Sequence, residues 1–94
     1  MTPIVTLNSR VRVPEDVLFQ ELHGEGVLLN LKTGVYLGLD SVGRRIFQLL
    51  QEDGALRNVL QRMLDEYDVA EAECASDLLA LVTEMEEHGI VTIA

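Results

Sequence analysis

The residue types that could form a metal site or a catalytic nucleophile are few and widely spaced in this chain. His23, Cys74 and His88 stand far apart, and none belongs to a C-x-x-C, H-x-x-x-H or H-E-x-x-H pattern that would bring two ligands together. Each has a simpler explanation. His23 is expected in a turn and Cys74 as a small apolar side chain. His88 is expected in the last turn of a helix, where a protonated imidazole interacts favourably with the helix dipole. We therefore predict no metal site.

Glycine-rich and acidic stretches offer no clearer catalytic site. The segments GEG and GVYLGLDSVG lack the G-x-x-x-x-G-K-[ST] pattern that holds phosphate groups, and close packing of strand and helix explains Gly38 and Gly43 more simply. Acid pairs such as Asp65 and Glu66 are expected on solvated helix surface, without an apolar cleft to raise a carboxyl pKa. We therefore expect neither a cofactor nor an enzymatic activity.

The charge is concentrated in the C-terminal third. The net charge is −9, yet all seven Lys and Arg lie within residues 1–62 beside seven acids, and the other nine acids, in 65–87, face no base. Such a field attracts basic ligands and repels phosphates. No apolar run approaches the roughly 18 residues of a membrane span, no signal-peptide pattern is present, and one cysteine permits no intrachain disulfide. We expect one cytoplasmic domain over 1–94, with no membrane partner.

The apolar pattern predicts an α+β fold that begins with strands. Residues 6–13 alternate loosely and stop at Pro14, within an extended N-terminal segment 1–16. Residues 17–22, 25–31 and 35–39 are predicted as a three-stranded antiparallel meander. Its turns fall at HGEG and at LKTG, where we expect Gly34 to adopt a positive φ in a three-residue loop closed by a bulge.

Three helices and a short C-terminal strand are predicted to follow the meander. Asp40 or Ser41 caps a helix that Gly54 ends, and a regular apolar stripe from Leu56 to Tyr67 marks a second helix. The third helix runs from about residue 70 to 88 and stops at Gly89, before a strand at 90–93. This order is winged-helix-like, which is compatible with a DNA-binding regulator or with a peptide-binding module.

The third helix favours the second of these possibilities. It carries six acids and no Lys or Arg, whereas contacts to phosphate supply most of the affinity for DNA, so we expect no nucleic-acid partner. On a helical wheel, Leu81 lies on a flank with Asp77 and Glu84. The last strand of the meander would have a neighbour on one side only. A free strand edge beside an apolar and acidic helix flank is suited to the addition of a peptide strand.

These segments also resemble a known family. GVLLNLKTGVYLGLDSVGRRIFQLL, then VLQRMLDEYDV and DLLALVTEMEEHGIV, are similar in order and spacing to the PqqD-like domains. These are the recognition elements for precursors of ribosomally synthesised, post-translationally modified peptides (RiPPs). The resemblance spans about residues 17–93 and includes standalone forms such as those of lasso-peptide pathways.

The resemblance implies a winged-helix-like domain that binds the leader segment of a precursor peptide and presents it to a separate enzyme. This enzyme would be a leader peptidase and cyclase, or a radical-SAM maturase. The leader would lie along the third strand of the meander, in the groove beside the third helix. By position, the implied contact residues are Val35, Tyr36, Leu37, Asp77, Leu78, Leu81, Glu84 and Met85.

Two questions stay open from the sequence. A docking adaptor that contacts only a maturase, without holding the peptide itself, shares every feature described so far. The loosely alternating residues 5–13 could pair within the chain or across a homodimer.

Overall fold

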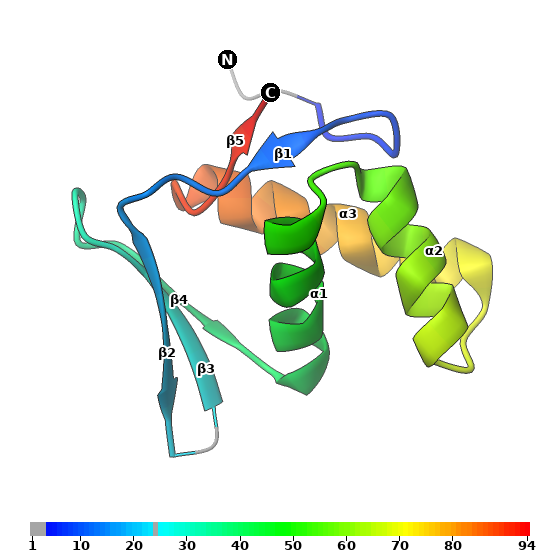
Figure 1. The fold of residues 1–94 in the computed structure, drawn as a ribbon, viewed down its shortest axis with the longest axis horizontal. Helices are drawn as coiled ribbons and strands as arrows, with labels where there is room; N and C mark the ends of the chain where they lie inside the picture. Colours follow the sequence, from blue (N-terminus) through cyan, green and yellow to red (C-terminus); the bar gives the residue numbers. More distant parts are fainter. Residues whose placement is uncertain (1–3, 24) are drawn as a thin grey trace.

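The computed structural model describes residues 4–23 and 25–94; residues 1–3 of the expected N-terminal segment and Gly24 of the expected HGEG turn lie outside them. A three-stranded antiparallel sheet is formed by β2 (Val17–Leu22), β3 (Glu25–Asn30) and β4 (Tyr36–Leu39) (Figure 1). Helices α1 (Ser41–Glu52), α2 (Leu56–Glu66) and α3 (Glu71–Glu87) follow. The predicted winged-helix-like α+β order, with meander, three helices and C-terminal strand, is confirmed.

The N-terminal segment pairs with the C-terminal end of the same chain. Strands β1 (Val11–Arg12) and β5 (Thr92–Ile93) form a separate two-stranded antiparallel sheet, which lies above the helices in Figure 1. The Val11 amide also donates to the Gly54 carbonyl at 2.9 Å, and a Cβ at Gly54 would lie 2.0 Å from the Val11 carbonyl oxygen. Residues 11–12 are thus paired within the chain, and Gly54 is required by the close approach of two backbones.

The loop between β3 and β4 is organised by the side chain of Asn30, which is 7% exposed. Its Oδ1 accepts hydrogen bonds from the backbone amides of Lys32 (2.9 Å) and Thr33 (3.2 Å), and its Nδ2 donates to the carbonyl of Gly89 at 2.8 Å. The loop comprises residues 31–34, one residue longer than the predicted loop, while Gly34 has the expected positive φ of 78°. Asn30 thereby ties the hairpin to the end of α3.

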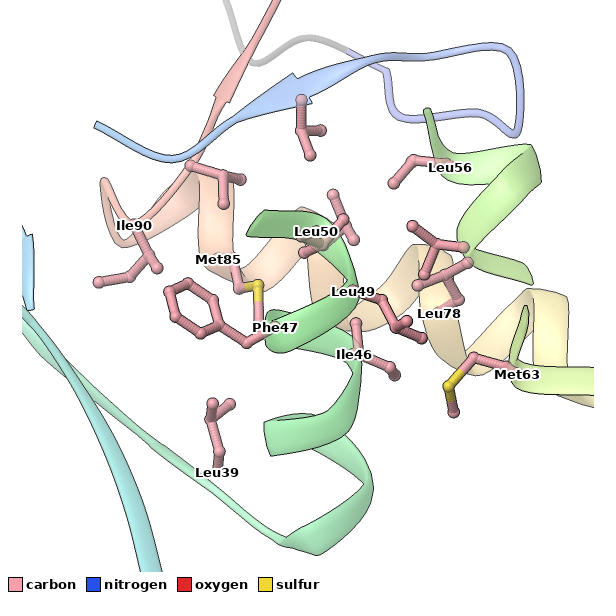
Figure 2. Close-up of a cluster of buried hydrophobic side chains, with 14 of the residues drawn as sticks. Leu39, Ile46, Phe47, Leu49, Leu50, Leu56, Met63, Leu78, Met85 and Ile90 are labelled. Carbon is pink, nitrogen blue, oxygen red and sulfur yellow. The ribbon is translucent and has the colours of Figure 1, made fainter. Parts of the chain in front are cut away.

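Helix α1 lies at the centre of the apolar core. Of the two predicted caps, Asp40 or Ser41, Asp40 is the N-cap, through an Oδ1 that accepts from the Gly43 amide at 2.8 Å. Its buried face contributes Ile46, Phe47, Leu49 and Leu50, which meet Leu78 and Met85 of α3 (Figure 2). Gly89 follows α3 with a φ of 72°, which lets the chain reverse and bury Ile90 beside this cluster.

Polar contacts fix α1 against the sheet and against α2. On the sheet side, Arg44 forms an ion pair with Glu21 of β2, and its guanidinium lies 5.8 Å from the ring centre of Phe19. On the α2 side, Arg45 donates two hydrogen bonds to Glu66, at 2.6 and 2.7 Å. Because both neighbours of α1 are held, the edge strand β4 and the helices keep a defined geometry.

No helix in the described part of the chain is long and apolar enough to cross a membrane.

Candidate peptide-binding groove

Strand β4 has a strand neighbour on one edge only within the described part of the chain. It pairs with β3, and the sheet order is β2-β3-β4. The Val35 carbonyl accepts from the Asn30 amide at 2.9 Å, so this carbonyl points toward β3. Since the direction of the main-chain groups alternates along an antiparallel strand, those of Leu37 also point toward β3, whereas those of Tyr36 and Gly38 point away. The free edge therefore presents Tyr36 and Gly38.

This alternation changes the expected strand contacts. Val35 lies before β4, and its amide faces the loop, donating to Thr33 Oγ1 at 3.3 Å. The Leu37 side chain is buried in the core. Neither residue has main-chain groups free for an added strand, whereas Tyr36 does, and its side chain is 70% exposed. Gly38, which we expected to serve in close packing, has outward main-chain groups instead of Val35 and Leu37.

A groove of about 380 Å³ lies where the free edge of β4 meets the helices. Its lining residues come from the end of β4, the first turns of α1 and the middle of α3: Gly38, Leu39, Asp40, Val42, Gly43, Ile46, Asp77 and Leu81. The predicted residues Asp77 and Leu81 thus face β4, with Leu81 half-buried and Asp77 exposed. The flank of α3 chosen from the helical wheel is the flank that borders the groove.

Two glycines of the groove differ in their surroundings. A Cβ at Gly43 would lie 3.2 Å from Leu39 Cδ2, which agrees with the close packing expected there. A Cβ at Gly38 would meet no heavy atom within 4 Å, so packing does not explain this glycine. Gly38 leaves the backbone of the edge strand open to a neighbouring chain.

Three other predicted contact residues lie outside the groove surface. Leu78 and Met85 are 0% exposed and belong to the core, and neither lines the groove. Glu84 is exposed on α3 but does not line the groove. The two buried residues support the helix from behind, and Glu84 remains available to a longer ligand only as a nearby charge.

The charged residues that line the groove are both acidic. Asp40 and Asp77 are exposed, and no Lys or Arg lines the groove. Burial raises the pKa of the nearby Cys74 thiol above its ordinary value, and Asp77 adds to the rise, so the reactive thiolate is disfavoured. Within residues 4–23 and 25–94, no three His, Cys, Asp or Glu side chains gather in a way that could hold a metal ion. The groove thus combines a free strand edge, apolar surface and two carboxylates.

The sequence carried a weak signal for the groove residues that were not predicted. Val42 follows the apolar spacing of α1, four residues before the buried Ile46, but it is 42% exposed and forms part of the groove wall. Gly38 lies inside a short strand, and glycine inside a strand often marks the close approach of another backbone. That signal pointed to Gly38 without telling an internal neighbour from an external one.

The comparison with protein families gives the class of this domain. The family model for coenzyme PQQ synthesis protein D (PqqD) matches residues 25–91, from the start of β3 to the residue before β5. The chain therefore belongs to the PqqD family. A search of curated protein sequences returned no match.

Two solved structures are similar to this chain over most of its length. One is TbiB1 in complex with the TbiA(beta) leader peptide, at 30% sequence identity and a TM-score of 0.76, covering 85% of this chain and 93% of that chain. The other is lasso peptide synthetase B1 complexed with the leader peptide, at 26% identity and a TM-score of 0.76, covering 88% of this chain and 98% of that chain. Both similar proteins were solved with a leader peptide bound.

Proposed function

We propose that this protein binds the leader segment of a ribosomally synthesised precursor peptide and presents it to a separate modifying enzyme. The observation that carries the proposal is the free edge of β4 beside a groove lined by Leu81 and Asp77. Membership of the PqqD family and the two similar structures with bound leader peptides support it. The leader would add a fourth strand to the sheet, next to β4.

Different residues of the groove would make different contributions to leader binding. The outward main-chain groups of Tyr36 and Gly38 fix the register of the leader through backbone hydrogen bonds. An apolar leader side chain enters the groove against Leu81, because this is where apolar surface is accessible. Asp77, with Glu84 farther along α3, attracts a leader Lys or Arg and contributes mainly to the rate of association.

The chemistry would belong to another protein, either a leader peptidase with its cyclase or a radical-SAM maturase. The role proposed for this chain is non-catalytic: it holds one segment of the precursor so that the rest reaches the active site of the enzyme. Tethering of this kind raises the local concentration of the substrate without any new contact at the reacting bond. We expect the exchange to take place in the cytoplasm, where precursor peptides are synthesised.

The test is a fluorescence-polarisation titration of the purified protein. Labelled leader segments from the short open reading frames beside its gene serve as ligands, and a labelled DNA duplex serves as the control. Saturable binding to one leader at about micromolar Kd, or about −8 kcal/mol, with none to DNA is the expected result. Absence of binding to every leader would refute the proposal in favour of the docking adaptor, and salt-sensitive binding to DNA would favour a regulator.

A further inference from the structure

A second pocket lies beyond the groove, where the three helices meet. Its volume is about 160 Å³, and its residues come from the start of α1, the end of α2, the α2–α3 loop and the start of α3: Val42, Ile46, Met63, Tyr67, Val69, Glu73, Cys74, Asp77 and Leu78. Most of these side chains are apolar. Val42 and Val69 stand at its rim and are 42% and 48% exposed.

These two valines leave apolar surface in contact with water at the rim of the pocket. Val69 belongs to no helix or strand, so helical periodicity does not place it at the surface. Burying the rest of such a side chain against an apolar ligand would be favourable, at about 25 cal/mol for each Å² removed from water. The pocket is thus suited to one apolar side chain, and its small volume excludes a folded element.

The second pocket adjoins the groove. Val42, Ile46 and Asp77 line both of them, so one wall is shared. Strand β4 runs from Tyr36 to Leu39 and leads directly into α1 (Figure 1), the helix that carries Val42 and Ile46 of this shared wall. A peptide strand that lies along β4 and continues past Leu39 therefore reaches the groove first and the second pocket next.

The charge around the second pocket limits what can occupy it. Among the residues that the structure describes, the charged residues lining it are Glu73 and Asp77, and both are acids. Every charged residue of α3 is acidic. An apolar side chain flanked by Lys or Arg is complementary to this surface, whereas an acidic segment is repelled.

We propose that the second pocket holds another side chain of the same bound peptide, apolar and next to a Lys or Arg, outside the segment that pairs with β4. This inference rests on the proposed leader binding. The protein then reads its ligand at two points, the groove at Leu81 and the pocket at Val69. A peptide that can add a strand but lacks the second apolar residue is bound less tightly.

The test compares two single substitutions of similar exposure. Val69→Asn removes the apolar rim without adding charge, and Leu22→Asn does the same on β2, at the opposite edge of the sheet, where Leu22 is 51% exposed. Thermal unfolding confirms that both variants are folded. With the labelled leader peptide, Val69→Asn is expected to raise Kd about fivefold or more, the loss expected for half a valine side chain, and Leu22→Asn less than about twofold.

An alanine scan of the peptide against both proteins makes the result specific. We expect one apolar residue outside the strand segment whose replacement weakens binding to the wild type but not to Val69→Asn, because the two changes remove the same contact. If the wild type binds the peptide and Val69→Asn binds it equally well, or if every effect is additive, this inference is overturned while leader binding stands. If the wild type binds no leader, both fail together.

Discussion

Replacing Gly38 with proline tests strand addition at the level of a single main-chain group. Proline removes the backbone N–H, and the alternation set by the Asn30–Val35 hydrogen bond directs the Gly38 N–H away from β3. The substitution therefore leaves the β3–β4 ladder intact, as for a proline on an edge strand. A Cβ at this position meets no atom within 4 Å, so the first ring carbon of the side chain has room.

The size of the effect follows from what the bound peptide would lose. The missing hydrogen bond contributes about 1 kcal/mol net, and the leader carbonyl left without a donor beside the groove costs about 1–3 kcal/mol more. A loss of about 2 kcal/mol corresponds to a Kd raised about 30-fold. Stability should change by less than about 1 kcal/mol, because no bond within the sheet is lost.

The assay is the leader titration by fluorescence polarisation, paired with urea unfolding of each variant. Gly38→Ala is the matched control, since it adds a Cβ and keeps the N–H, and its Kd should stay within about threefold of the wild type. A Gly38→Pro protein that is as stable as the wild type and binds the leader equally well would show that the peptide does not pair with β4.

Three further substitutions test the groove, the hairpin and an ion pair. Leu81→Ala should weaken leader binding by about 2 kcal/mol, whereas Glu84→Lys should mainly reduce its salt dependence; if neither changes binding, the groove is not the site. Asn30→Leu should lower the free energy of unfolding in urea by about 2–4 kcal/mol, because three backbone groups lose their partners; a loss under about 1 kcal/mol would contradict this. Hydrogen bonds from Arg45 lower the pKa of Glu66 below its ordinary 4.5, so the ion pair stabilises the fold above about pH 4.5, and this stabilisation is lost as the pH falls further. Glu66→Gln should therefore reduce the fall of Tm below about pH 4.5. An unchanged dependence of Tm on pH in this range would contradict the prediction.

The order of elements was predictable because local signals agreed with the global fold. The apolar spacing of α1 and its Asp40 cap, and the positive φ at Gly34 and Gly89, depend on neighbours within a few residues. The loop length was wrong for a non-local reason. Asn30 bonds both its own loop and Gly89, 59 residues away, and no local pattern reveals that second partner.

The site residues were harder to predict because they depend on which strand residues turn their main-chain groups outward and on how deeply each helix side chain is buried. A sequence shows that main-chain direction alternates along β4, but the pair that closes the hairpin, Asn30 with Val35, decides which residues point outward. A helical wheel likewise orients Leu81 and Leu78 without telling how deeply α3 is packed. In the structure Leu78 is wholly covered and Leu81 is not.

The contact between Asn30 and Gly89 links the stability of this domain to its proposed role. It joins the hairpin that carries β4 to the end of α3, which are the two elements on either side of the groove. An edge strand held in this way does not need to be ordered when a peptide arrives, so less binding energy is lost to immobilisation. Strand β4 has only four residues and is held in place, and a short, fixed edge pairs less readily with the sheet edges of other molecules. A groove made of a free strand edge, Leu81 and two carboxylates can thus select a peptide through shape and charge alone.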